Sequence, residues 1–190
     1  MGRHRYVGHG RRAIEEWELQ ELLSASRSAR ARVVYLLAAD AGLRRAEALD
    51  VSSSDVLPTR IHVRHGKGRV SRWTVNTERI QAAIAAVGHL PVDRCYSWAG
   101  FTFEKDRIRA GLAADLSLHC LRHRFAQRLL EAGVNLIDIQ ALLGHRDLAT
   151  TAVYLHDSPA RFERARLAIQ GEICTASFGI PSLNRQLKGW

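Results

Sequence analysis

The sequence is poor in cysteine and has no long hydrophobic run. Its three cysteines, Cys95, Cys120 and Cys174, are scattered and show no Cys-x-x-Cys spacing, so a disulfide framework is not expected. The apolar stretch 33–39 is too short to span a bilayer, and no apolar run follows the basic amino terminus as in a signal peptide. The chain also has no internal repeat and no low-complexity tract. These absences predict a soluble protein of the reducing cytoplasm.

Lysine is scarce although the chain is strongly basic. Of its 28 basic residues only Lys67, Lys105 and Lys188 are lysines, and the formal net charge is +9 with a pI near 10.3. Clustered basic side chains gain affinity for polyanions by releasing phosphate counterions, which makes nucleic acid the expected partner. A coding bias toward GC-rich codons would also explain the excess of arginine. At 190 residues the chain can bury one full core and has little room for a second domain.

Hydrophobic spacing predicts a mainly α fold with one small antiparallel β-hairpin. Strands are expected at 61–65 and 69–75, on either side of a Gly-Lys-Gly turn, whereas 91–98 is expected to be irregular or a short strand. Gly42, Gly133 and Gly144 are expected to end helices, and Ser117 to cap one. Helices are expected at about 14–23, 28–41, 44–49, 77–87, 102–113, 118–132, 136–143, 150–155 and 159–170.

Two arginines stand in motifs that suit a phosphate site. Arg44 lies in Gly-Leu-Arg-Arg-Ala-Glu, which ends at Glu47, and Arg122 lies in His119-Cys-Leu-Arg-His. A phosphodiester under attack develops charge on its non-bridging oxygens, and each guanidinium can offer them a planar, bidentate fork. Such charge-assisted hydrogen bonds are worth roughly 1.5–3 kcal/mol each. Removal of either guanidinium is therefore expected to lower the reaction rate by orders of magnitude. Arg44 taken alone is better explained as a solvated charge or a salt-bridge partner; the joint occurrence of the motifs favours the site.

A tyrosine downstream supplies a candidate nucleophile. The phenol of Tyr154 has an ordinary pKa of about 10, so it needs a base or a strongly positive pocket to react at neutral pH. His119, and His145 in Leu-Leu-Gly-His, could accept a proton or bind the phosphate, and Lys67 in the hairpin turn is the candidate general acid for the leaving sugar oxygen. A phosphotyrosine conserves the bond energy, so no ATP is needed. Because the arginines neutralise the charge, no metal and no cofactor are expected.

Simpler explanations exist for each motif. His119 and His123 lie four residues apart beside a cysteine, which makes a zinc site conceivable, but no metalloprotease Glu and no matching Cys/His pair accompany them. The Gly-Lys-Gly turn is a common composition, and Arg69 or His65 could share the work assigned to Lys67. His145 could be only a residue at a helix end, and Tyr154 only a packing residue. The spacing of the two together with the other motifs argues against this.

The order and spacing of these motifs resemble those of the tyrosine recombinases, the phage integrase family. In that family a Gly-Leu-Arg-x-x-Glu box, a hairpin lysine, a His-x-Leu-Arg-His box and a Leu-Gly-His box precede the nucleophilic tyrosine, which follows the last box by nine residues. The resemblance covers roughly 14–170. The matching residues are, in chain order, Arg44 with the supporting Glu47, then Lys67, His119, Arg122, His145 and the nucleophile Tyr154.

The resemblance implies the fold of the tyrosine recombinase catalytic domain and site-specific DNA recombination of the integrase or invertase type. One strand would be cleaved to leave a 3′-phosphotyrosine and a free 5′-hydroxyl, without metal or ATP. It implies double-stranded DNA as the partner, a homotetramer on DNA formed from protomers that can be monomers in solution, accessory proteins that bend or clamp DNA, and no membrane.

Three regions are expected: a basic arm at 1–13, the catalytic domain at 14–170, and an apolar tail at 171–190. The tail either folds back on its own domain or, as we hypothesise, docks on a neighbouring protomer. Most family members carry an N-terminal helical clamp domain, whereas about a dozen residues precede the catalytic domain here, as in the short fimbrial phase-variation invertases. The arginines expected to contact DNA are Arg3, Arg5, Arg11, Arg12, Arg45, Arg69, Arg124 and Arg146.

Two other functions share much of this pattern. A type IB topoisomerase uses nearly the same groups but typically shows a Ser-Lys-x-x-Tyr motif, and the segment Thr150-Thr-Ala-Val-Tyr154 lacks that lysine. A DNA-binding regulator that retained the fold would need neither the tyrosine nor both arginines. Relaxation without recombination would indicate the first, and indifference to Tyr154→Phe the second.

Overall fold

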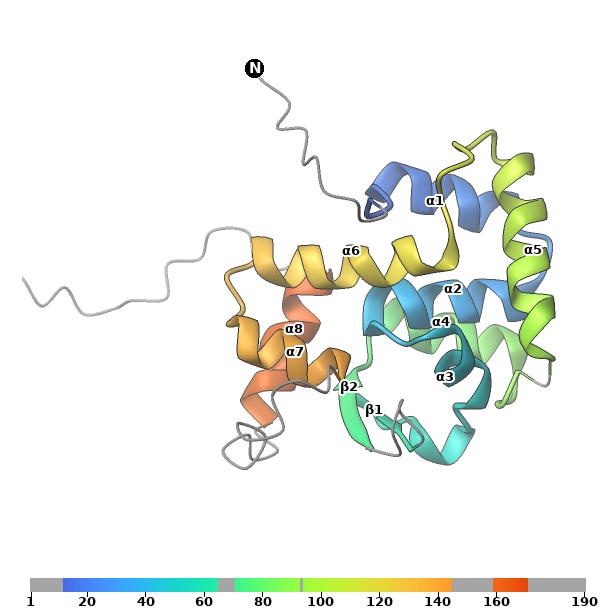
Figure 1. The fold of residues 1–190 in the computed structure, drawn as a ribbon. Coiled ribbons are helices and arrows are strands. Elements are labelled where there is room, and N and C mark those ends of the chain that lie inside the picture. The colour runs from blue at the N-terminus through green and yellow to red at the C-terminus, as the bar shows by residue number, and fades with distance from the viewer. Residues whose placement is uncertain (1–11, 65–70, 93, 145–158, 171–190) are drawn as a thin grey trace, which may run out of the picture.

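The computed structural model describes residues 12–64, 71–92, 94–144 and 159–170 (Figure 1). Within them the fold is mainly helical with one two-stranded antiparallel sheet, as the sequence predicts. The elements, in chain order, are α1 (Glu16–Ala25), α2 (Ala29–Ala41), α3 (Arg45–Asp50), the 3₁₀ helix η1 (Ser53–Asp55), β1 (Arg60–Val63), β2 (Arg72–Val75), α4 (Glu78–Val87), α5 (Tyr96–Arg109), α6 (Leu118–Glu131), α7 (Leu136–Leu143) and α8 (Pro159–Gln170).

Helix α2 is the central element. It begins after Ser28, whose hydroxyl accepts a hydrogen bond from the backbone N–H of Ala31 at 3.2 Å, and it ends at Gly42. Its residues from 33 to 41 are all buried, because α6 packs on one side and α4 on another (Figure 1). A helix that is apolar on every side is stable only inside a domain. The segment that follows Gly42 therefore starts from a rigid position.

The hairpin lies beside the end of α2. Strands β1 and β2 pair antiparallel with Val63 opposite Arg72 and Ile61 opposite Thr74. Ile61 and Val63 face the core, and the Thr74 hydroxyl donates to the carbonyl of Ala41 at 2.7 Å. This bond fixes β2 against the last turn of α2.

The carboxyl-terminal helices form a second part of the core. Phe125 and Leu129 from α6 pack with Ile139 and Leu142 from α7 and with Ile169 from α8. In Figure 1 α7 and α8 lie together on the opposite side of the molecule from α5, and α6 runs from them to beneath α1. The segment 42–47, which follows α2, and the segment 142–144, at the end of α7, carry the site described below.

One element departs from the sequence expectation. The sequence predicts an irregular segment or a short strand at 91–98 and a helix at 102–113, but α5 already begins at Tyr96 and ends at Arg109. Ala99, Phe103 and Asp106 form a buried stripe at helical spacing, and this packing outweighs the low helix propensity of Gly100. The helix expected at 150–155 lies outside the described residues.

Candidate active site

Arg44 and Glu47 are placed by the turn that follows α2. Gly42 adopts a left-handed backbone conformation with φ of 68°, and a Cβ there would lie 2.5 Å from the Phe125 ring, so only glycine fits. The turn buries Leu43 and brings Arg44 to the N-cap of α3. The backbone N–H of Arg44 donates to Glu47 Oε2 at 2.8 Å, and its Nη1 donates to Oε1 at 2.9 Å. The spacing of the Arg-x-x-Glu motif is thus that of a helix cap.

Arg122 and His119 come from the first turns of α6. They are three residues apart and therefore lie on the same side of the helix. Arg122 is buried, and its guanidinium donates to the carbonyl oxygens of Gly42 and Leu143, the latter at 2.7 Å. His119 is exposed at the amino-terminal end of α6, where the helix dipole favours a negatively charged ligand.

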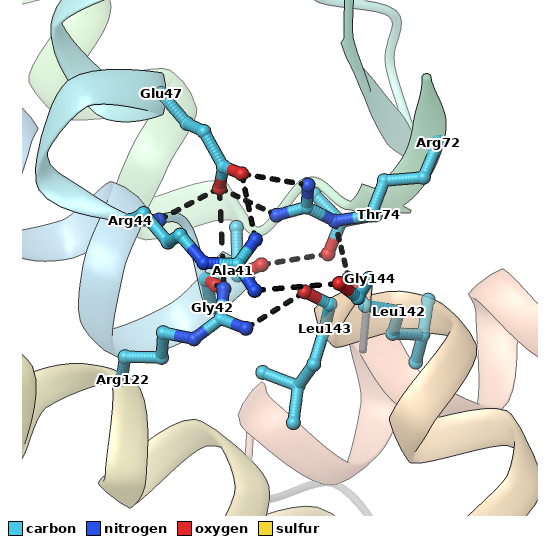
Figure 2. A network of polar contacts seen from close by, with 10 residues as sticks. All are labelled: Ala41, Gly42, Arg44, Glu47, Arg72, Thr74, Arg122, Leu142, Leu143 and Gly144. Carbon is cyan, nitrogen blue, oxygen red and sulfur yellow. Dashed lines mark hydrogen bonds and ion pairs between the residues drawn. The ribbon is translucent and has the colours of Figure 1, made fainter. Parts of the chain in front are cut away.

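Three arginines converge on the carboxyl-terminal end of α7 (Figure 2). Helices leave their last carbonyl groups without partners, and here side chains from other elements bind three in succession. Arg72 from β2 donates through Nε to Leu142 O at 2.9 Å, Arg122 donates to Leu143 O, and Arg44 donates through Nη2 to Gly144 O at 3.3 Å. Sequence reasoning missed Arg72, because one more arginine in an arginine-rich strand carries no motif.

Glu47 is the carboxylate that joins these arginines. Arg72 binds it with both amino groups, Nη1 to Oε1 at 2.9 Å and Nη2 to Oε2 at 2.6 Å, and Arg122 Nη1 lies 3.9 Å from Oε2 (Figure 2). Burial alone would raise the pKa of Glu47, but the hydrogen bonds and charge of Arg72, together with the bonds from Arg44, lower it to about 2. Glu47 is therefore ionised at neutral pH and supports the arginines.

The site carries more positive than negative charge. Burial, followed by the neighbouring charges of Arg44 and Arg72, lowers the pKa of Arg122 to about 9 although Glu47 opposes the shift. Burial and these like charges disfavour the charged form of Arg122, so a negatively charged ligand nearby would stabilise it. Arg44 and Arg122 also have more N–H donors than the contacts described above use. The arrangement thus favours an anion that can accept several hydrogen bonds, such as a phosphate diester.

A cavity of about 520 Å³ opens beside the arginine pair. Its lining includes Arg44, Arg45, His119 and Arg122, so the structure brings four residues predicted from sequence to one concave surface. Arg45 stacks on the ring of Tyr96, with its guanidinium carbon 3.5 Å from the ring centroid. The remaining wall is largely apolar and is formed by α2, α5 and the start of α6.

The other described arginines predicted to contact DNA are held elsewhere. Arg124 is buried on α6 with its guanidinium against Glu16, which departs from the prediction of a phosphate contact. Arg12 is clamped by Glu18 at 2.6 Å and by Asp115 at 3.0 Å. Eight predicted residues lie outside the described ones: Arg3, Arg5, Arg11, Lys67, Arg69, His145, Arg146 and Tyr154.

The rings of His119 and His123 meet edge to face, with centroids 4.4 Å apart. Among the residues that the structure describes, no three His, Cys, Asp or Glu side chains are grouped as metal ligands would be. No helix in the described part of the chain is long and apolar enough to cross a membrane.

Comparison with known proteins identifies relatives of this chain among recombinases. Residues 98–161 match the phage integrase family. The chain is 31% identical over 151 residues to the tyrosine recombinase XerA of Saccharolobus solfataricus, covering 76% of this chain and 52% of XerA. It is 32% identical over 154 residues to a tyrosine recombinase of Pseudothermotoga lettingae, covering 73% of this chain and 54% of the relative. The chain therefore spans about half the length of these relatives.

Solved structures extend the likeness to most of the chain. The integrase of mycobacterium phage Brujita superposes with a TM-score of 0.68 at 27% identity, covering 90% of this chain and 61% of that protein. The catalytic core of lambda integrase shares the fold, with a TM-score of 0.59 over 71% of this chain and 92% of that core. Fold and site together define the catalytic domain of a tyrosine recombinase. The chain is similar to the phage integrase family over residues 98–161 and to curated tyrosine recombinases over about three quarters of its length.

Proposed function

We propose that this chain cuts and rejoins DNA at specific sites through a covalent link to Tyr154. The observation that carries the proposal is the convergence of Arg44 and Arg122 on the carbonyl groups of Gly144 and Leu143. The chain continues directly from Gly144 to His145 and reaches Tyr154 nine residues after His145. The phosphate site and the nucleophile's segment are thus joined by a short length of chain.

The chemistry follows from the groups present. The phenol oxygen of Tyr154 attacks the phosphorus, the bond from phosphorus to the 5′ oxygen breaks, and the DNA 3′ end remains as a phosphotyrosine. Arg44 and Arg122 bind the non-bridging oxygens, which gain charge in the transition state. By resemblance to the family, His119 and His145 assist at the phosphate and Lys67 protonates the leaving 5′ oxygen. The reverse attack by a 5′-hydroxyl reseals a strand.

The proposed partner is double-stranded DNA, bound by several copies of the chain. A XerH recombinase is described as bound to its difH substrate, and a lambda integrase tetramer as bound to a Holliday junction. We extend both properties to this chain: a tetramer on two DNA sites, acting in the cytoplasm. The predicted similarity in architecture to the fimbrial invertases, and the help of clamp or bending proteins, stay predictions.

The proposal is tested by trapping the covalent adduct on supercoiled DNA that carries the gene's own flanks, in the presence of EDTA. Wild-type protein should form an adduct that survives denaturant, and Tyr154→Phe should form none. Tyr96→Phe is the informative comparison, because Tyr96 is half-exposed and its phenol is the one that lines the arginine-lined cavity among the described residues. An adduct that persists in Tyr154→Phe and disappears in Tyr96→Phe would overturn the proposal.

The same reaction separates the other functions. Recombined products show a recombinase, whereas an adduct with relaxation alone indicates a topoisomerase. Intact DNA binding without any adduct from the wild type, with the flanks in place, indicates either that a missing partner or domain is essential or that the chain is a DNA-binding regulator.

A further inference from the structure

Arg72 lies among the site residues although nothing in the sequence motifs assigns it a role. Its side chain is almost completely buried, with 7% of its surface exposed. It spans from strand β2 to Glu47 on α3 and to the carbonyl of Leu142 on α7 (Figure 2). A Cβ on Gly144 would lie 2.9 Å from Arg72 Cδ, so the last turn of α7 is shaped around this side chain.

Glu47 can pair with any of three arginines, and this creates a competition. Arg72 binds both carboxylate oxygens, whereas Arg44 binds one of them through Nη1 and Arg122 lies farther away. A bidentate guanidinium–carboxylate pair is the strongest arrangement these groups can form. If Arg72 were absent, Glu47 would be left to Arg44 and Arg122, the two groups that a phosphate needs.

We infer that Arg72 is a positioning residue: by binding both oxygens of Glu47, it limits the pairing of the carboxylate with Arg44 to the bond through Nη1 and leaves Arg122 at 3.9 Å, so that donors of both arginines remain for a phosphate diester. Among the described residues, three guanidiniums surround this one carboxylate, which leaves an excess of two positive charges. Removing Arg72 halves that excess. Removing Glu47 as well restores the excess of two positive charges, although the contacts that Arg72 makes from β2 to α3 and α7 remain lost.

This inference rests on the proposed function for its activity test and has a separate binding test. Single-turnover cleavage at saturating DNA should slow by about 10- to 100-fold in Arg72→Gln, the scale of one lost charge-assisted hydrogen bond. The affinity for DNA should change far less, because the many phosphate contacts elsewhere remain. The double variant Arg72→Gln/Glu47→Gln should cleave faster than Arg72→Gln alone.

The matched control is Arg107→Gln. Arg107 is equally buried, with 9% of its side chain exposed, and likewise bridges a glutamate, Glu104, to a backbone carbonyl, that of Leu112 at 2.8 Å. It lies near the end of α5 and does not itself line the arginine-lined cavity, although its partner Glu104 does. Arg107→Gln should lose stability much as Arg72→Gln does but keep its cleavage rate.

Recovery in the double variant is the decisive result, since a merely structural bridge would leave the double variant as slow as Arg72→Gln or slower. That outcome, or wild-type cleavage by Arg72→Gln, would overturn the inference. Should Arg72→Gln fail to fold, Arg72→Lys keeps the charge without the fork and should cleave faster than Arg72→Met. Equal rates in that pair would also count against the inference.

Binding of inorganic phosphate, followed by ³¹P NMR line broadening, gives the second readout. Wild type and the double variant should bind phosphate more tightly than Arg72→Gln. Equal affinity in all three would refute the role of Arg72 even if the wild type forms no adduct. An absent adduct with the expected order of phosphate affinities would refute the proposed function alone.

Discussion

Glu47 is the residue on which the site's arginines depend. Its carboxylate is almost completely buried and binds the side chains of Arg44 and Arg72. A buried carboxylate is costly unless it is fully paired, and here Arg44 and Arg72 supply that pairing. The geometry therefore makes Glu47 a support for the arginines, which agrees with the supporting role that the family resemblance implies.

The lowered pKa of Glu47 gives a pH-dependent stability. Because its pKa falls from 4.5 to about 2 on folding, the ionised group stabilises the folded state above pH 4.5, and this stabilisation is lost as the pH falls toward 2. The free energy of unfolding should therefore drop by on the order of 2 kcal/mol more in the wild type than in Glu47→Gln across that window. Urea denaturation of both proteins from pH 5 to pH 3 measures the divergence. Parallel pH profiles would show that Glu47 is not strongly paired.

Residue-scale prediction from sequence was uneven for a physical reason. Arg44 with Glu47, and His119 with Arg122, are local pairs whose three-residue spacing is that of one helical turn, so the sequence alone places each pair together. Arg72 reaches Glu47 across 25 positions of the chain, a contact made by tertiary packing alone. No local pattern encodes such a contact.

At the scale of elements, the end of α7 is where arginines from three other elements meet. Gly144 has a positive φ of 67°, as expected for the glycine that ends a helix, and it packs directly on Arg72. Gly133, which follows the end of α6, has a similar φ of 73°, but a Cβ added there would meet no atom within 4 Å. The two glycines thus share a backbone conformation and differ in their surroundings.

This difference gives a matched pair of substitutions. Gly133→Ala should cost about 1 kcal/mol from backbone strain and leave cleavage near the wild-type rate. Gly144→Ala should cost that strain and in addition displace Arg72, which lowers the cleavage rate about tenfold or more. Thermal unfolding and single-turnover cleavage of both variants test the pair. Equal cleavage by the two would mean that the α7 end does not position the site.

The elements themselves were largely predictable, and the exception is instructive. The glycine stops at Gly42 and Gly144 and the hairpin pairing follow local rules and were confirmed. The predicted start of α5 was wrong by six residues, because Gly100 and the aromatic residues before it disfavour a helix locally. A Cβ on Gly100 would lie 2.7 Å from Arg45 Nη1, the far end of a flexible side chain, so an alanine there would require only that the guanidinium move. This proximity is visible only in three dimensions.

At the scale of the whole molecule, the net charge overstates the basic surface. Many arginines are paired within the fold, including Arg79 with Asp40 at 2.8 Å and Arg109 with Asp106 at 2.5 Å. Composition suggests a polyanionic partner, yet it cannot separate the arginines that hold the fold from those that bind a ligand. Arg124, predicted to contact DNA and found buried, is the clearest case.

The division into an arm at 1–13, a domain at 14–170 and a docking tail at 171–190 stays a prediction. The same holds for Lys67, His145 and Tyr154, which lie outside the described residues. The described residues supply two arginines, an imidazole and a carboxylate, held by α3, α6 and the end of α7. The identity of the nucleophile must therefore be determined by experiment.

The most direct measurement is the chemical identity of the link between protein and DNA. A substrate nicked close to the cleavage site lets the short fragment diffuse away and traps the adduct, which is then digested with protease and nuclease and examined by mass spectrometry. The account predicts one modified peptide, with a nucleotide 3′-phosphate on Tyr154. A nucleotide attached through its 5′-phosphate, or to any residue other than Tyr154, would contradict it.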